Sequence, residues 1–309
     1  MPVPAAPQSK RYWSDIARAI TAATHATFTL ERRSAAAGGC INTASTIEGN
    51  GRRYFVKTND ASRATMFEAE AAALSELLSA RAVRVPEPIC HGADAEASWI
   101  VLEHIELAHR RPSTDAILGA QLAQLHRHTA DVYGWTRDNT IGSTPQSNLP
   151  SPDWRAFWRD QRLRTQLNLA RENGYGGRLQ GEGQRLLELV PAFFVSYTPQ
   201  PSLLHGDLWS GNAAADENGA PVIFDPALYY GDREADIAMT ELFGGYSPSF
   251  YDAYGAAYPL DAGYTVRKNL YNLYHVLNHL NLFGSGYLRQ AEQMIDDLLA
   301  RSLKAAALS

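Results

Sequence analysis

Residues 203–212 read Leu-Leu-His-Gly-Asp-Leu-Trp-Ser-Gly-Asn, and residues 222–226 read Val-Ile-Phe-Asp-Pro. The pattern predicts an apolar strand, a loop with Asp207 and Asn212, a turn near Gly219, and a second apolar strand that ends at Asp225. We expect a hairpin of this kind to hold the three polar side chains around one point.

Phosphoryl transfer needs such a set of side chains. One carboxylate accepts the proton of the attacking hydroxyl, while an amide and a second carboxylate hold Mg²⁺ on the phosphates. Asp207 precedes Asn212 by five residues, which is also the spacing in the catalytic loop of protein kinases. The alternative is a hairpin whose polar residues bond only their own backbone. With Asp225 in register, the set favours a kinase-type site, with Asp207 as the base and Asn212 and Asp225 as metal ligands.

Composition limits the other classes of function. The chain has 309 residues, 45% of them apolar and 20% charged, with a net charge of −5 and two cysteines. These values describe a soluble globular protein with one large or two medium domains. Nucleic-acid binding is disfavoured because no basic block is present. No apolar run is long enough to span a membrane, no signal peptide is evident, and two cysteines suit a reducing cytoplasmic location.

The N-terminal part predicts an antiparallel sheet and one helix. A small-residue turn within residues 35–42 joins two strands, and its tip can approach a ligand closely. The strand Arg53–Lys57 ends in a lysine, where a kinase-like fold places the cation for the nucleotide phosphates. The helix predicted over residues 65–78 carries Glu68 and Glu70. We expect Glu70 to pair with Lys57, and Glu68 is the other candidate.

The chain then changes from sheet to helix. Prolines mark an edge strand after residue 85, and residues 99–107 form an apolar strand. Backbone groups near Glu103 and Ile105 are the expected adenine contacts, by order in the chain alone. We place the boundary near Ala108, which gives a nucleotide-binding lobe of residues 1–107 and a mainly helical lobe of residues 108–309.

The second lobe contains further polar residues whose roles differ. The periodicity predicts a helix over residues 114–129, capped by Ser113 or Thr114, with His126 and His128 as structural residues at its end. Residues 134–148 read as a long polar loop, either a lid or a wall of the acceptor site. We expect Asp236 to be a buried anchor that accepts hydrogen bonds from the catalytic-loop backbone. Further predicted helices cover residues 153–172, 183–191, 246–258 and 268–283.

The sequence resembles the fructosamine kinase (ketosamine-3-kinase) family, within the larger aminoglycoside-phosphotransferase and choline-kinase-like group. The most specific matches are His-Gly-Asp-Leu-Trp-Ser-Gly-Asn at residues 205–212, Tyr-Gly-Asp-Arg-Glu-Ala-Asp at 230–236, and Leu-Asn-His-Leu-Asn-Leu-Phe-Gly at 277–284. The resemblance implies an α+β, bilobal, protein-kinase-like fold. It also implies ATP- and Mg²⁺-dependent phosphorylation of the 3-hydroxyl of a ketosamine, after which the phosphate eliminates and the amine is freed.

The resemblance also assigns residues. Asp207 is the general base, Asn212 and Asp225 hold Mg²⁺, and Lys57 and Glu70 position the phosphates. The glycine-loop residues Gly38, Gly39, Cys40, Ile41 and Asn42 match the family's nucleotide loop. Trp209 lies on the acceptor side, where an exposed indole can stack on a sugar, although a core tryptophan is an equal alternative. His279 is a further candidate for the acceptor pocket.

Partners and regulation follow from the same resemblance. Ketosamine small molecules or glycated proteins are the expected substrates, and the protein is a monomer or a homodimer, because relatives can link through a cysteine at the place of Cys40. Asp225 and Asp236 are eleven residues apart, too close for an activation segment, so protein-kinase activity is not expected. The alternative is a small-molecule kinase of the same group that acts on another hydroxyl acceptor.

Overall fold

The computed structural model describes residues 10–36 and 41–306. The chain divides into two compact units, and each is described by itself. The first unit contains residues 1–114 and 214–226, and the second contains residues 115–213 and 227–309. The predicted lobe boundary near Ala108 stays a prediction. The first unit also takes a segment from much later in the chain, and that segment ends just after Asp225.

The first unit contains a five-stranded antiparallel sheet with the strand order β1-β2-β3-β5-β4. The strands are β1 (Arg32–Ala35), β2 (Thr43–Gly49), β3 (Arg52–Asp60), β4 (Pro88–Ala93) and β5 (Ala97–Glu103). Strand β4 lies at an edge of the sheet, as its prolines predict, because a proline cannot donate to a ladder on both sides.

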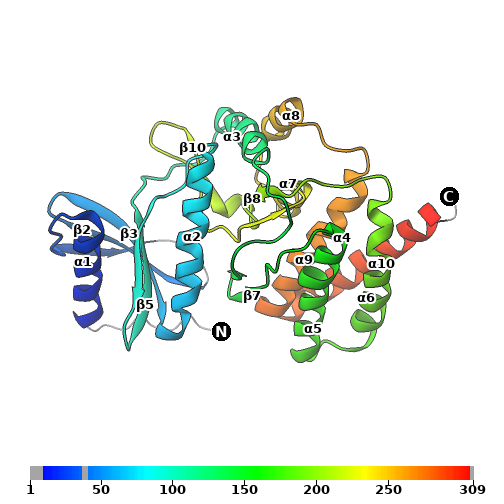
Figure 1. Cartoon of the computed structure of the whole chain (residues 1–309), viewed down its shortest axis with the longest axis horizontal. Coiled ribbons are helices and arrows are strands. Elements are labelled where there is room, and N and C mark those ends of the chain that lie inside the picture. Colours follow the sequence, from blue (N-terminus) through cyan, green and yellow to red (C-terminus); the bar gives the residue numbers. More distant parts are fainter. Residues whose placement is uncertain (1–9, 37–40, 307–309) are drawn as a thin grey trace. The chain divides into compact units, whose positions relative to one another are not determined.

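Helices α1 (Lys10–Thr24) and α2 (Ala64–Ala80), with the 3₁₀ turn Ala61–Arg63 before α2, cover opposite faces of this sheet (Figure 1). Alternation along β3 decides which side chain meets which helix. Tyr54 and Val56 belong to the apolar core shared with α1, whereas Lys57 points to the other face and meets α2. A strand lysine is thereby buried next to a helix.

The hairpin predicted around Asp225 is built differently from the expectation. Strand β10 (Pro221–Ile223) pairs with β9 (Ala213–Ala215), whereas β8 (Ser202–Leu204) pairs with β11 (Tyr229–Gly231). The prediction that β8 and β10 form one hairpin was therefore wrong, because the three residues of β9 already complete the ladder with β10.

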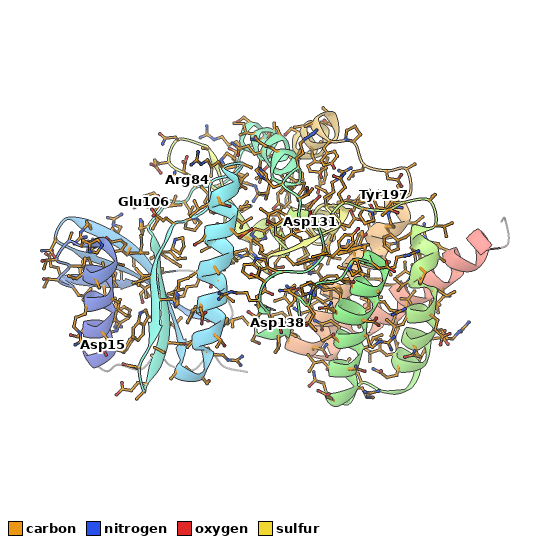
Figure 2. The ribbon with its side chains drawn as sticks, viewed as in Figure 1. Asp15, Arg84, Glu106, Asp131, Asp138 and Tyr197 are labelled. Carbon is orange, nitrogen blue, oxygen red and sulfur yellow. The ribbon has the colours of Figure 1, made fainter. Side chains whose placement is uncertain are left out.

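An arginine and an aspartate hold the β9–β10 turn in place. The Asp216 carboxylate accepts backbone hydrogen bonds from Asn218 and Ala220, both at 2.9 Å. It also accepts from the Arg84 guanidinium at 2.5 Å, and Figure 2 labels Arg84. The backbone carbonyl of Arg84 accepts a hydrogen bond from the amide of Ile223 at 3.0 Å. Strand β10, which leads to Asp225, is therefore fixed at both ends.

The second unit is mostly helical. Its helices include α3 (Pro112–Leu125), α4 (Trp154–Phe157), α5 (Arg164–Glu172), α6 (Gly177–Leu189), α7 (Glu234–Leu242), α8 (Pro248–Ala257), α9 (Tyr264–Phe283) and α10 (Leu288–Ala306). Short 3₁₀ turns cover Val190–Phe194, Ser210–Asn212 and Ser285–Tyr287. Helix α9 is buried along most of its length and packs against α5, α7 and α10. The expectation of an α+β chain with a sheet first and helices after it is confirmed.

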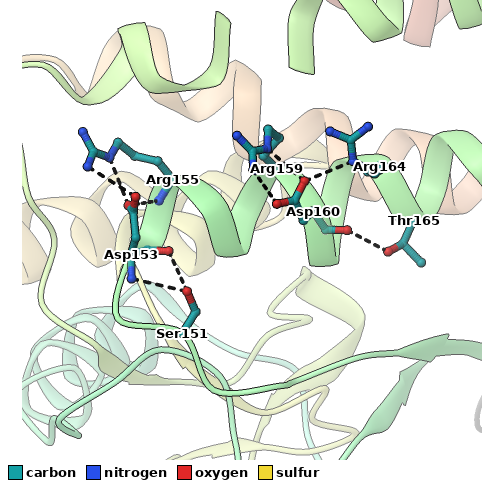
Figure 3. A network of polar contacts seen from close by, with 7 residues as sticks. All are labelled: Ser151, Asp153, Arg155, Arg159, Asp160, Arg164 and Thr165. Carbon is teal, nitrogen blue, oxygen red and sulfur yellow. Dashed lines mark hydrogen bonds and ion pairs between the residues drawn. The ribbon is translucent and has the colours of Figure 1, made fainter. Parts of the chain in front are cut away.

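A π-helical turn, Trp158–Leu163, joins α4 to α5. Asp153 begins this helical segment, and its carboxylate accepts from the Arg155 amide at 2.9 Å (Figure 3). The Asp160 carboxylate accepts from Arg159 at 2.8 Å and from Arg164 at 3.0 Å, and its carbonyl accepts from Thr165 at 3.1 Å. These contacts link consecutive turns across the π-helical segment.

Two details differ from the sequence-based expectation. Residues 134–148 contain the hairpin β6 (Asn139–Ile141) and β7 (Thr144–Gln146), whose amide side chains are buried, so this is not an open polar loop. Helix α3 begins at Pro112, and Thr114 donates to the carbonyl of Gly219 at 3.0 Å instead of capping the helix. Among residues 10–36 and 41–306, no helix has the length and apolarity needed to cross a bilayer.

Candidate active site

In the first unit, one buried lysine holds two carboxylates. Lys57, 7% exposed, donates to Glu70 at 2.6 Å and to Asp225 at 2.5 Å. The predicted pairing with Glu70 is thus present. Glu68, the other candidate, is exposed on the same helix. Lys57 extends from β3 and Glu70 from α2. Because both side chains are held by these elements, the arrangement of the pair is fixed.

The neighbouring charges affect the protonation of Lys57 and of Glu70. Burial alone would lower the pKa of Lys57, but Asp225 and Glu70 outweigh burial and raise it. Burial raises the pKa of Glu70, with Lys57 opposing and Asp225 adding to the rise. The lysine therefore stays charged at neutral pH, which suits a cation that binds phosphate oxygens.

Asp225 has an unusual backbone. Its φ is 59°, in the left-handed region that residues with a side chain seldom adopt. Such strain costs about 1–3 kcal/mol and persists where the surroundings over-determine the conformation. Here β10 precedes Asp225, and Lys57 binds its carboxylate, which is 36% exposed. The strain identifies Asp225 as a candidate functional residue independently of any motif.

The choice between the two glutamates can be tested directly. Replacing Glu70 by glutamine removes one of the two charges that hold Lys57, so we expect kcat/KM for ATP to fall by about 10²-fold through misplacement of the ammonium. The matched variant Glu68→Gln, two residues earlier on the same helix and exposed, should change kcat/KM for ATP less than about twofold. Steady-state kinetics on both variants decides the matter. Equal losses in the two would contradict the assignment.

In the second unit, Asp236 holds the loop that carries Asp207. Its two carboxylate oxygens accept from the amides of His205 at 2.7 Å and Gly206 at 2.8 Å. The predicted anchoring role is confirmed. Gly206 has φ 84°, and a Cβ there would lie 2.1 Å from the carbonyl oxygen of Ala227, so only glycine fits.

The fully buried His126, seen in the sequence only as a helix-end residue, completes this anchor. Its Nε2 lies 3.2 Å from Asp236, and its Nδ1 lies 2.8 Å from the Tyr254 hydroxyl. Burial lowers the pKa of His126, against the opposing effect of Asp236. Burial would raise the pKa of Asp236, but the bond from His126 and the loop backbone outweigh burial and lower it.

These shifts predict a pH dependence of stability. His126 is neutral in the folded state at a pH where the unfolded histidine is protonated, so unfolding takes up a proton below about pH 6.5. Between pH 7.5 and pH 5 the wild type should therefore lose more unfolding free energy than His126→Gln does. Urea unfolding of both proteins at both pH values measures the loss of unfolding free energy in each, and the two losses are then compared. A larger loss in the variant would contradict the assignment.

Asp207 and Asn212 lie together at the end of this loop. The Asn212 side-chain nitrogen donates to the Asp207 carbonyl at 2.9 Å and to its carboxylate at 3.3 Å. The Asp207 amide lies 3.3 Å from Nδ1 of His205, which is fully buried. The 3₁₀ turn Ser210–Asn212 makes the five-residue separation compatible with this contact. The two residues that the motif pairs are thus adjacent in space.

Trp209 is exposed rather than part of the core. It has 40% of its surface accessible, which makes the core alternative wrong, whereas the stacking of the indole on a sugar stays a prediction. Its ring lies over Gly211, where a Cβ would come within 2.2 Å of the indole. The Tyr246 hydroxyl donates to the carbonyls of Leu208 at 3.3 Å and Trp209 at 3.4 Å. The indole therefore projects from a supported loop.

His279 lies on α9 among other aromatic rings. Its ring centroid is 4.9 Å from that of Phe243, 5.3 Å from that of Phe283 and 5.1 Å from that of Tyr287. Its Nδ1 lies 2.8 Å from the carbonyl oxygen of His275, and burial lowers its pKa. Half-exposed Phe243 and Phe283 make this an aromatic surface with a neutral imidazole at its centre.

The expected nucleotide residues are described in part. The Asn59 side chain donates to the carbonyl of Ile41 at 3.2 Å and to the side chain of Asn42 at 2.7 Å. Gly38, Gly39 and Cys40 lie outside the described residues. The amide of Glu103 donates to Glu87 at 2.8 Å and is therefore used within the sheet. The adenine contacts at Glu103 and Ile105 stay predictions.

The donor atoms suit a hard divalent cation. Mg²⁺ prefers carboxylate and amide oxygens; the first unit contains one such group at Asp225, and the second unit contains one at Asn212. The Asn212 amide turns its nitrogen to Asp207, so its oxygen is the atom that would ligate the cation. Strain at Asp225 is a further sign of a functional position.

Comparison with known proteins bears on the family and on the fold. A family model described as fructosamine kinase matches residues 12–301. A probable ketoamine kinase of Synechocystis sp. is 44% identical over 288 residues, covering 93% of this chain and 97% of that protein. A chloroplastic protein-ribulosamine 3-kinase of Arabidopsis thaliana is 45% identical over 271 residues, covering 87% and 82%.

Solved structures give the fold. A putative fructosamine-3-kinase from Haemophilus somnus matches with a TM-score of 0.86 and 29% identity, covering 93% of this chain and 97% of that one. An aminoglycoside phosphotransferase with ADP bound matches at 13% identity and shows the kinase-like fold alone. The predicted fold class is confirmed. Because the family model and the relatives span almost the whole described sequence, the chain belongs to the fructosamine kinase family.

Proposed function

We propose that the protein uses ATP to phosphorylate a sugar hydroxyl, at the 3-position, of ketosamines such as ribulosamines or fructosamines. The observation that carries the proposal is the buried Lys57, which Glu70 and Asp225 hold at 2.6 and 2.5 Å in a chain of the fructosamine kinase family. The names of the relatives support the substrate class. Elimination of the 3-phosphate would then free the amine and reverse glycation.

Each side chain has a stated task in this proposal. Asp207 takes the proton from the attacking 3-hydroxyl, and Asn212 keeps the Asp207 carboxylate oriented through its amide. Lys57 binds phosphate oxygens of ATP, and Glu70 fixes the direction of its ammonium. Asn212 and Asp225 would hold Mg²⁺, which when bound neutralises charge on the phosphates. The exposed Trp209 and the aromatic surface at His279 would bind the acceptor.

An acceptor screen tests the proposal. ATP consumption is measured with ribulosamine, erythrulosamine and fructosamine carried on small amines, on peptides and on a glycated protein. We expect turnover with at least one ketosamine, followed by slow release of inorganic phosphate and of the free amine. An aminoglycoside, choline and the parent amines are the matched acceptors for the alternative small-molecule kinase. Turnover with these acceptors and with no ketosamine would overturn the proposal. Oligomeric state and a cytosolic location stay predictions.

A further inference from the structure

Arg162 is a buried cation for which the proposed chemistry has no role. It lies in the π-helical turn Trp158–Leu163, its side chain is 0% exposed, and no carboxylate pairs with it among the residues that the structure describes. Its guanidinium donates to the carbonyl of Ser147 at 2.5 Å and to the side chain of Asn148 at 2.7 Å. Single π-helical turns often occur at functional sites.

Aromatic rings take the place of a counter-ion. The guanidinium carbon lies 4.1 Å from the ring centroid of Tyr229, 4.6 Å from that of Phe157 and 5.8 Å from that of Tyr274. Cation–π contacts of this kind are favourable, but they offset only part of the cost of taking a charged group out of water. Within residues 10–36 and 41–306, the Nε of Arg162 has no hydrogen-bond partner. Packing alone would be served better by an apolar side chain, so the charge and its fixed donors require another explanation.

The hydrogen bonds of Arg162 lead to a set of buried amide side chains in the β6–β7 hairpin and just after it. Asn148 accepts from Arg162 and donates to Asn139 at 3.0 Å, and Gln146 donates to the same oxygen of Asn139 at 2.9 Å. The Asn148 backbone donates to Asp138, labelled in Figure 2, at 2.8 Å. Because each amide oxygen has its donor, the orientation of each nitrogen is set by its neighbour, starting at Arg162.

The amide chain ends on the segment that follows Asp225-Pro226. Asn139 donates to the carbonyl of Leu228 at 2.8 Å, and Gln146 donates to the carbonyl of Ala227 at 3.0 Å. The amide of Ala227 in turn donates to the carbonyl of His205 at 2.9 Å, two residues before Asp207. One network of hydrogen bonds therefore reaches both the catalytic loop and the chain that emerges from Asp225.

A buried tyrosine also joins the network, at Gln146. The Tyr274 hydroxyl donates to the side-chain oxygen of Gln146 at 2.7 Å. Burial raises the pKa of Tyr274 to about 12, with Arg162 opposing and the Asp207 carboxylate adding to the rise. Tyr274 is thus bonded to the network at Gln146, and the Arg162 guanidinium carbon lies 5.8 Å from its ring centroid.

We propose that Arg162 is a positioning residue that acts through Asn148, Asn139, Gln146 and Tyr274 to set the place of the Asp207 loop and of residues 227–228. The catalytic part of this inference rests on the proposed role of Asp207. A guanidinium suits the task because its planar fork donates in fixed directions to Ser147 and Asn148, which an ammonium cannot reproduce.

Two variants and a matched control test the inference. Arg162→Lys keeps the charge and loses the fork, and Tyr274→Phe removes one hydroxyl from the far end of the network with little risk to folding. Arg267→Lys is the control, because Arg267 is also buried in the same unit and stacks on a tyrosine, but it pairs with Glu234 and Asp261. Hydrogen exchange read by mass spectrometry follows residues 203–207 and 227–231 in each protein, and kinetics gives kcat and KM separately.

We expect faster exchange at residues 203–207 and 227–231 in Arg162→Lys and Tyr274→Phe but not in Arg267→Lys. With the best acceptor, kcat should fall by about 10²-fold in Arg162→Lys, with KM for ATP unchanged, since Lys57 lies in the other unit. Unchanged exchange in both network variants, or equal changes in all three, would overturn the inference. Absence of ketosamine turnover in the wild type would instead overturn the proposed function, and exchange would still decide the network.

Discussion

Replacing Asp207 by asparagine is expected to lower kcat by about 10³-fold, because general acid–base catalysis contributes about 10²–10⁴-fold and an amide cannot accept the hydroxyl proton. The asparagine keeps the shape of the aspartate. It also keeps the backbone carbonyl that accepts from the Asn212 side-chain nitrogen at 2.9 Å in the wild type. Folding and nucleotide binding should therefore remain, with the midpoint of thermal unfolding in Mg-ATP close to that of the wild type.

The control for this variant is Asp131→Asn, which removes an exposed carboxylate from the same unit. Its kcat should stay within about twofold of the wild-type value. Steady-state assays with the best ketosamine and a thermal shift with Mg-ATP give both quantities. If Asp207→Asn kept wild-type kcat, the catalytic-loop assignment would be wrong for every kinase function considered.

Replacing Asp236 by asparagine should have the largest effect on stability, about 3–5 kcal/mol of unfolding free energy. The carboxylate accepts from two loop amides and from His126. An asparagine places an NH₂ group where an acceptor is needed, so at least one buried amide loses its partner. Because His205 and Gly206 lead directly to Asp207, kcat should fall as well in the fraction that remains folded.

Urea unfolding measures this change, with Asp296→Asn as the comparison. Asp296 pairs with Arg178 at the surface, with 40% of its side chain exposed, and its loss should cost less than about 1 kcal/mol. A cost of similar size in both variants would show that the buried bonds of Asp236 contribute little, and the anchoring role would then be wrong in energetic terms.

Several parts of the site were predictable because local rules determine them. Strand alternation places Lys57 opposite the face that Val56 shares with α1, and the helix that follows brings Glu70 within reach. The position of Asp236 as an acceptor for loop amides was also predictable from the motif. The first feature depends on spacing within and between neighbouring elements, and the second on a motif, and the sequence shows both directly.

Other parts depend on contacts between distant segments and were missed. The pairing of β8 with β11 involves three-residue strands, too short for a periodic signal. Residues 134–148 are polar, which usually indicates an exposed loop, but Asn139, Gln146 and Asn148 satisfy one another inside the protein. Arg162 looks like an ordinary helix cation, and no local pattern shows that its neighbours in space are rings and amides.

The discontinuous first unit has a consequence for biosynthesis. Arg84 pairs with Asp216, and Lys57 with Asp225, although each carboxylate leaves the ribosome more than a hundred residues after its basic partner. While residues 115–226 are still being translated, the nascent N-terminal segment lacks the β9–β10 hairpin, and Glu70 alone can neutralise Lys57. The first unit therefore cannot be completed before residues 214–226 are made, and a fragment ending at Thr114 would lack the β9–β10 hairpin and Asp225.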